Sequence, residues 1–549
     1  MSHSTSSQHP PKLKLIHGDG AHLSRVLEMG KILRSILDGP NAISRVREMH
    51  STSLHRLVAT LGREECQDLI ALAAPDQVRD LLDLSLWEKD QFIFYEALEW
   101  ARFLTSLPEK TLVQDLKALD IELLGLIFYH HFEILLVEED EIPEETEGIL
   151  HQTPDRWFIL HVSEENKENA EEIIGLIESY YRLDPDEARR LLLNLRSELP
   201  TELEEQCYRW RSGRLQDLGF VSPDEAQGLY TYLNPHREKE RLLNSLDTPK
   251  APLPSGTPIL LDTLLPAAWR SPEQSFFSQV CAHISRLSDK EFLGTHLLYL
   301  SNRALTADGL SPNNISQAED SLENLLWRLS LGLEYLAEEN LSRAAVLLMT
   351  VPLQTVARIG FSLTVDVAKP LRQGAAQNKL GHAPYKVDLL DPLLAQRIEP
   401  LLSKFPAYFD PNTNLPRAFK SLVELEIAKK WVTEAMAIME YLETHQIRSK
   451  IPDEHTLGDL FRTELIGSLL DTPGPITRQT LSCFIRSYIS TGKLSEEVFQ
   501  LAHKMAQETC LRPETIRDWL ARLEECVGTL TLERPPEVKY IEGLIFKDQ

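Results

Sequence analysis

Short stripes of apolar residues at helical spacing recur along this chain and limit what it can fold into. Each stripe follows the i, i+3, i+4, i+7 pattern of an amphipathic helix, and Pro75 separates the second stripe from the third. Short helices of this kind cannot bury their apolar faces alone. The spacing therefore predicts a mainly α fold of stacked helical hairpins, similar to an α-solenoid, over residues 21–128. The first three stripes are Leu54, Leu57, Val58 and Leu61; Cys66, Leu69, Ile70 and Ala73; and Val78, Leu81, Leu82 and Leu86.

Two segments interrupt the helical pattern with β-branched and aromatic residues. Residues 131–137 read HFEILLV and residues 156–163 read RWFILHVS. The stretch between them is acidic and contains prolines, so it is expected to be an exposed connection. The pattern predicts a small β-hairpin with an acidic loop, inserted into the helical protein at residues 129–165.

Helix-start signals and proline content divide the rest of the chain. Asp184 and Ser222 each precede a proline and an acidic residue pair, the arrangement of an N-cap followed by a capping box. Residues 248–258 read TPKAPLPSGTP, which disfavours both helix and sheet. The predicted divisions are a disordered tail at 1–20, the hairpin array at 21–128, the β-hairpin at 129–165, a helical region at 166–247, a linker at 248–258 and a C-terminal helical domain at 259–549.

The charge balance argues against one class of partner. The chain has 57 basic and 83 acidic residues, for a formal net charge of −26 at pH 7. Binding a phosphate backbone depends on clustered Lys and Arg. We therefore expect no nucleic-acid partner.

Cysteine usage and the N-terminal composition indicate a cytoplasmic protein. The six cysteines are scattered without the paired spacing of zinc or redox motifs, so reduced thiols are expected. Residues 1–14 contain no apolar run of the kind found in a secretory signal. No apolar stretch approaches the roughly 18 residues that cross a bilayer, so no membrane insertion is expected.

Common enzyme signatures do not occur in the sequence. The chain has no GxxxxGK[ST] loop, GxGxxG, HExxH, GxSxG or EF-hand loop. This disfavours catalysis without excluding an enzyme whose site is assembled from scattered residues. No cofactor is predicted.

His130, His131 and Glu133 form the densest cluster of residues that could bind a metal. Imidazole and carboxylate groups bind zinc or iron, and His151 and His161 would lie nearby if the two predicted strands pair. The alternative, which we favour, is that these histidines are hydrogen-bonded structural residues. The acidic stretch at 138–147 could likewise attract Mg²⁺ or Ca²⁺, although a solvated loop is the simpler interpretation.

A second candidate lies in the segment RWRSGRL. Trp and Arg dominate the energetics of protein interfaces, so Arg209, Trp210, Arg211 and Arg214 could form an interaction site. The structural alternative, which we favour, is that Arg211 and Arg214 pair with nearby carboxylates such as Asp217 and Glu225. Core packing is the default expectation for the tryptophans Trp87, Trp100, Trp157, Trp210 and Trp327.

Three stretches carry a resemblance to a known family. Residues 69–87 (LIALAAPDQVRDLLDLSLW), 204–230 (EEQCYRWRSGRLQDLGFVSPDEAQGLY) and 331–363 resemble an uncharacterised bacterial family, catalogued only as a domain of unknown function. RWRSGRLQDLGF is the most specific part, and the similarity extends from about Arg45 over most of the chain. This resemblance implies no activity and no catalytic residue.

The first helices are also similar to the cytosolic helical domain of MgtE-type magnesium transporters. That similarity covers residues 53–126 and implies a right-handed superhelix of helical hairpins with acidic residues that sense Mg²⁺. No specific metal-binding residue of this chain matches.

Three functional hypotheses follow. The first is a non-catalytic scaffold or adaptor that binds a protein partner, as α-solenoids do. The second is a regulatory protein that senses a divalent cation or a small ligand. The third is an enzyme with an unrecognised site. The sequence leaves the oligomeric state open.

Overall fold

The computed structural model describes most of the chain and consists mainly of helices. The described residues form two compact units. The predicted linker at 248–258 and most of the predicted tail and acidic loop lie outside the described residues, although α1 already begins at Asp19. The structure describes residues 19–138, 148–164, 167, 170–197, 199–244, 275–284, 287–377, 379–381, 385–444, 447–452, 454–509, 513–528, 530 and 541–547.

The first unit contains the chain up to Leu229 together with Cys281–Leu325. In it α3 packs against α5, α5 against α7, and α7 against α9, so successive odd-numbered helices lie side by side. Its helices are α1 (Asp19–Leu37), α2 (Ala42–Glu48), α3 (Ser51–Leu61), α4 (Gln67–Leu72), α5 (Pro75–Ser85), α6 (Phe94–Ser106), α7 (Glu109–Ala118), α8 (Ile121–Tyr129), α9 (Ala170–Leu183), α10 (Pro185–Ser197), α11 (Pro200–Asp217), α12 (Pro223–Gln227) and α16 (Leu287–Asp308).

The apolar stripes of the sequence form the core of this unit. Leu54, Leu69, Val78 and Leu81 are fully buried in one continuous cluster. The predicted helix starts are confirmed as well. Asp184 accepts a hydrogen bond from the amide of Glu187 at 2.9 Å at the start of α10. At the start of α12, the hydroxyl of Ser222 accepts a hydrogen bond from the amide of Glu225.

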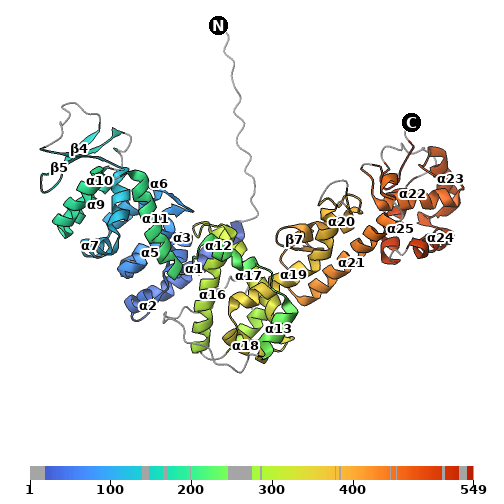
Figure 1. Cartoon of the computed structure of the whole chain (residues 1–549), viewed down its shortest axis with the longest axis horizontal. Helices are drawn as coiled ribbons and strands as arrows, with labels where there is room; N and C mark the ends of the chain where they lie inside the picture. The colour runs from blue at the N-terminus through green and yellow to red at the C-terminus, as the bar shows by residue number, and fades with distance from the viewer. Residues whose placement is uncertain are drawn as a thin grey trace, which may run out of the picture. The chain divides into compact units, whose positions relative to one another are not determined.

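The insertion into the first unit is a three-stranded antiparallel sheet, where the sequence predicts a two-stranded hairpin. Its strand order is β3-β5-β4, with Glu133 paired to His161 and His151 paired to Leu160. The added strand β4 lies in the stretch predicted to be a connection. Its sequence ILHQ is short, and only Ile149 and His151 are partly buried. Figure 1 shows these strands beside α9 and α10. The strands of the unit are β1 (Trp87–Glu88), β2 (Gln91–Phe92), β3 (Glu133–Leu136), β4 (Ile149–Gln152) and β5 (Phe158–Val162).

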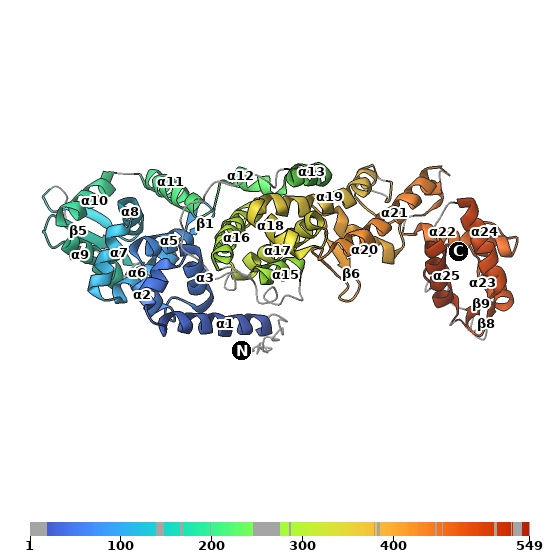
Figure 2. The same ribbon diagram turned by 90° about the horizontal axis from the view of Figure 1, so that it is seen from below.

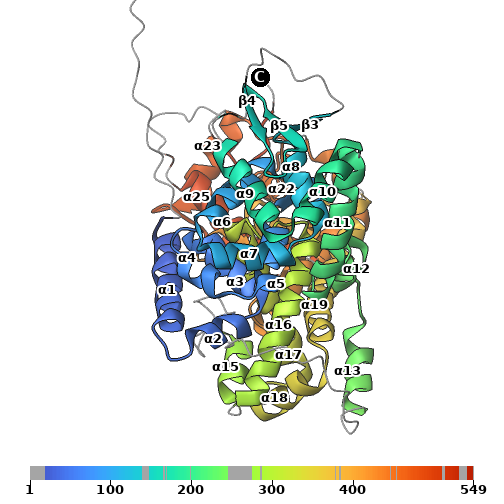
Figure 3. The same cartoon turned by 90° about the vertical axis from the view of Figure 1, so that its left-hand side faces the viewer.

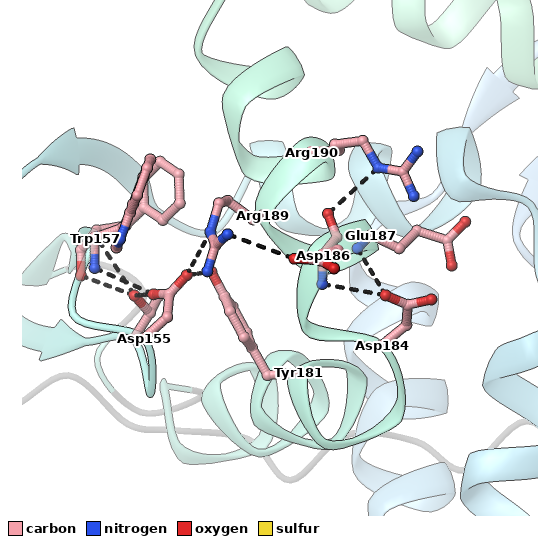
Figure 4. Close-up of polar contacts among 10 residues, drawn as sticks. Asp155, Trp157, Tyr181, Asp184, Asp186, Glu187, Arg189 and Arg190 are labelled. Carbon is pink, nitrogen blue, oxygen red and sulfur yellow. Dashed lines mark hydrogen bonds and ion pairs between the residues drawn. The ribbon is translucent and has the colours of Figure 1, made fainter.

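One carboxylate fastens the turn between β4 and β5 to the helices. Asp155 accepts hydrogen bonds from the Thr153 hydroxyl at 2.6 Å, the Trp157 amide at 3.1 Å and Nε of Arg189 at 3.1 Å. The Tyr181 hydroxyl approaches the same carboxylate, and the guanidinium of Arg189 also lies over the Trp157 ring (Figure 4). These contacts lower the pKa of Asp155 against the opposing effect of burial. The sheet is therefore held against α9 and α10.

The second unit contains Tyr230–Thr248, Ser275–Val280 and Leu326–Gln549. The helices α15 and α17 each contribute residues to both units. The elements are α13 (Pro235–Asn244), α15 (Phe276–His283), α17 (Ile315–Ala337), α18 (Leu341–Thr350), α19 (Leu353–Ala376), α20 (Pro392–Leu402), β6 (Tyr408–Asp410), β7 (Leu415–Arg417), α21 (Leu422–Thr444), α22 (Leu457–Leu469), α23 (Arg478–Tyr488), β8 (Ile489–Ser490), β9 (Lys493–Leu494), α24 (Glu496–Thr509) and α25 (Pro513–Val527), with short 3₁₀ turns at Gly228–Tyr230 and Ile447–Lys450.

Two glycines allow α17 and α19 to cross in backbone contact. A Cβ at Gly332 would lie 2.1 Å from the Val356 carbonyl oxygen, and one at Gly360 would lie 1.9 Å from the Arg328 carbonyl oxygen. Only a residue without a side chain fits at either position.

Residues 541–547 pack against α22. Figure 2 shows the group formed by α22, α23, α24 and α25. Within it Arg462 is fully buried, and its Nε donates to the Gly543 carbonyl at 2.8 Å. The Ile545 amide donates to the Thr463 hydroxyl at 2.9 Å. The end of the chain is therefore fastened to α22.

The mainly α fold with a small β insertion is confirmed. Val346 on α18 is 53% exposed, so one side of this apolar helix faces away from the core. Among the described helices, none combines the length and the apolar character that crossing a bilayer requires.

Candidate functional site

The helix α11 carries the arginine and tryptophan residues that the sequence singles out. It packs against α8 and α5, with Leu203, Cys207 and Leu215 on its buried face. Figure 3 shows α8, α10 and α11 in the same part of the first unit. These apolar contacts set the rotation of the helix and so decide which of its polar residues point inward.

Arg214 points inward and forms the strongest ion pair of the helix. Its Nε and Nη2 contact the two carboxylate oxygens of Asp83 at 2.6 and 3.0 Å, and its Nη1 contacts Asp120. Asp83 is only 1% exposed. Burial alone would lower the pKa of Arg214, but the hydrogen bonds and charges of Asp83 and Asp120 raise it. Arg214 is therefore charged, and it links α11 to α5 through Asp83 and to the start of α8 through Asp120.

Arg211 is held by backbone and ring contacts instead. Its Nε donates to the Asp83 carbonyl at 2.7 Å, and its guanidinium lies 5.3 Å from the Trp87 ring centroid and 5.9 Å from that of Tyr208. Burial lowers the pKa of Arg211 to about 10, so it remains charged at neutral pH. The partners differ from the expected Asp217 and Glu225.

Arg209 and Trp210 point away from the body. Trp210 is 58% exposed, so the default expectation of core packing does not hold for this tryptophan. Arg209 makes only an exposed contact with Glu205 at 3.4 Å, one turn earlier on the same helix. Tyr208 and Leu199 are also exposed. Arg209 and Trp210 are together called the α11 face below.

The histidine candidates meet in a separate hollow of about 570 Å³ at the base of β3. His130, His131 and Glu133 line it together with His161, whose Nδ1 lies 3.4 Å from the Glu133 carboxylate. The expected proximity of His161 is thus observed. His151 contacts Glu178 at 3.3 Å instead and does not line the hollow.

His131 is the unusual member of this group. It is 4% exposed, and neither ring nitrogen has a hydrogen-bond partner among the described residues. Burial lowers its pKa to about 4, so the ring is neutral at pH 7. Across the described part of the chain, no group of three or more His, Cys, Asp or Glu side chains is arranged to hold a metal ion.

Sequence reasoning missed the long-range members of both sites. Asp83 and Asp120 precede Arg214 by more than two helices, and Arg196 and Ser163 complete the hollow from α10 and the end of β5. No local spacing connects these residues. The only available signal was Asp83 on the apolar face of α5, because a buried carboxylate needs a cation as its partner.

Comparison of the chain with known proteins identifies a family and no activity. The family model describes a family of unknown function, DUF6178, and matches residues 21–547. Comparison with curated proteins and with solved structures gives no match. The resemblance to a family of unknown function is thereby confirmed, while the similarity of the first helices to MgtE-type transporters stays a prediction. The chain belongs to the DUF6178 family.

Proposed function

We propose that this protein is a non-catalytic helical scaffold that binds another protein through the α11 face. The single observation that carries the proposal is the outward position of Trp210 and Arg209 on a helix whose inner side is fixed by Arg211 and Arg214. A rigid helix loses little conformational entropy when its exposed aromatic residue is buried by a partner. Trp, Tyr and Arg are also the residues most enriched at interface hot spots.

The packing of the first unit supports a solenoid-like scaffold. Each of α3, α5, α7 and α9 contacts the next in the series, as stacked hairpins do. We also propose a cytoplasmic location, which the free thiols of the five described cysteines support.

The partner we propose is a protein with an apolar pocket for the Trp210 indole. A photoreactive amino acid replaces Trp210 in the full-length protein, expressed in its own host. Tyr95, an exposed aromatic residue of the same unit at 68% exposure, is the matched control position. We expect one discrete crosslinked product from position 210 and none of the same mass from position 95.

The companion variant is Trp210→Ala. It should lose the partner that the crosslink identifies, with an unchanged melting temperature, whereas Tyr95→Ala should retain it. A crosslink to a second copy of this chain would show that the α11 face mediates self-association. Identical crosslinks from both positions, or none from 210, would overturn the proposal.

A second function, small-ligand binding, is favoured by the buried and unpartnered His131 beside the hollow of about 570 Å³. Native mass spectrometry on protein from its own host tests it. A retained small mass that His131→Leu releases would support this function, and a bare chain in both proteins would exclude it.

A further inference from the structure

A group of cations in the second unit converges on one cluster of aromatic rings. Tyr230, Phe361 and Phe405 contact one another, with ring centroids separated by 4.6 to 6.2 Å. The guanidinium carbon of Arg328 lies 4.8, 5.8 and 5.1 Å from those three centroids. The guanidinium therefore caps a triangle of rings, and cation–π attraction holds it there.

One further cation contacts a ring of this triangle, and two others bind the backbone of segments that adjoin the rings. Lys404 Nζ lies 5.0 Å from the Phe405 centroid. Nε of Arg358 donates to the Thr231 carbonyl at 3.2 Å, directly beside the first ring in sequence. Arg372 donates to the Leu401 carbonyl near the end of α20 at 3.3 Å and to the carbonyl of Lys404 in the following loop at 3.4 Å. We call Arg328, Arg358, Arg372 and Lys404 the cation cluster.

The cation cluster has no acidic partner. None of its members forms an ion pair with a carboxylate anywhere in the described part of the chain, and Arg328 has no hydrogen-bond acceptor there either. The carboxylate of Asp366, on the same face of α19, accepts a hydrogen bond from the Tyr232 hydroxyl at 2.8 Å. Arg343 of the same unit, by contrast, pairs with Glu338 at 3.2 Å.

This absence is informative because the chain is so acidic. The chain has 83 acidic residues against 57 basic ones, yet within the described residues none of the carboxylates pairs with Arg328. Arg328 is half-buried and contacts rings rather than carboxylates. The N–H groups of its guanidinium are therefore available to bind a ligand. A planar guanidinium fixed in this way suits bidentate recognition of an oxyanion.

We propose that the cation cluster binds the phosphate group of a small molecule. Arg328 and Lys404 both lie against the Phe405 ring, and two cations at one ring favour a multiply charged phosphate over a single carboxylate. Arg328 supplies the bidentate contact, and Lys404 adds a point charge from the neighbouring loop. Arg372 positions that loop through its carbonyls. The site is independent of the α11 face.

The test is isothermal titration of the full-length protein with pyrophosphate at constant ionic strength. Saturable binding is expected, and Arg328→Gln should weaken it at least about tenfold, because a charge-assisted bidentate contact is lost. Lys404→Gln should weaken it several-fold. Arg343→Gln, which removes an equal charge from a paired arginine of the same unit, should leave the affinity unchanged.

Three results would overturn the proposal. These are no saturable binding to the unaltered protein, an equal loss of affinity in Arg343→Gln, and equal or tighter binding of citrate, a carboxylate probe of similar charge. If Arg328→Gln fails to fold, Lys404→Gln decides the question, because an exposed lysine is removed with little structural consequence.

Discussion

Arg214 on α11 and Arg328 on α17 are both half-buried arginines, but their surroundings differ in one respect. Arg214 meets the buried carboxylate of Asp83 and that of Asp120, whereas Arg328 meets three aromatic rings and, among the residues that the structure describes, no carboxylate. The first arrangement neutralises charge and fixes helices together. The second holds a cation in place and leaves its charge available to a ligand. The comparison shows that the role of an arginine depends on the groups that its guanidinium contacts rather than on how deeply it is buried.

Removing the paired arginine should have the largest effect on stability. Arg214→Ala leaves the 1% exposed carboxylate of Asp83 buried without its cation, and breaking such a pair costs about 3–5 kcal/mol. Arg209→Ala on the same helix removes only an exposed pair and should cost less than about 1 kcal/mol. Urea unfolding monitored by tryptophan fluorescence measures both. Equal losses would show that Arg214 is not a structural ion pair.

The next effect concerns the helix crossing that brings Phe361 under Arg328. Gly360→Ala places a Cβ 1.9 Å from the Arg328 carbonyl oxygen, so α19 must shift, at an expected cost of about 1–3 kcal/mol. Gly213→Ala on α11 meets open space and should stabilise by about 0.5–1 kcal/mol. Thermal unfolding of the two variants checks the opposite signs. A tolerated Gly360→Ala would contradict the close crossing.

A smaller effect is expected from an acid that lacks a cation. Asp115 is 2% exposed, and burial raises its pKa from the ordinary range of an aspartate to about 7. The folded state thus binds this proton more tightly than the unfolded state does. Its contribution to stability is present below about pH 4 and is lost as the pH rises toward 7, by about 1 kcal/mol per pH unit. Asp115→Asn should flatten that slope in unfolding measured between pH 4 and 8, and an unchanged slope would exclude Asp115 as its source.

The smallest effect should come from the α11 face itself. Trp210 is 58% exposed, so Trp210→Ala should change the free energy of unfolding by no more than about 0.5 kcal/mol. Trp87→Ala, which empties a buried site under Arg211, should cost about 3–5 kcal/mol. Denaturant titration of both variants distinguishes the two tryptophans. A large loss on removing Trp210 would make it a structural residue.

Much of the fold could be predicted because its signals are local. The spacing of Leu54, Leu57 and Val58 specifies a helix within three turns, and Asp184 specifies where α10 begins. The strand β4 was missed because ILHQ carries too short an alternation to be distinguished from a loop.

The sites were harder to predict because their signals are not local. Arg209, Arg211 and Arg214 are clustered in the sequence, yet the fold separates them into one exposed and two buried residues. The cation cluster shows the reverse, since Arg328 and Lys404 are far apart in the chain and meet only at Phe405. Helix rotation and tertiary contacts decide both outcomes, and a single sequence records neither.

One measurement tests the central contrast directly. The folded protein is treated with an arginine-selective dicarbonyl reagent, and the modified positions are identified by peptide mass spectrometry over time. Arg328 should react early and be protected by pyrophosphate, because its donors face no carboxylate. Arg214 should react only when the protein unfolds, because Asp83 and Asp120 hold it. Equal rates at the two positions would contradict the account.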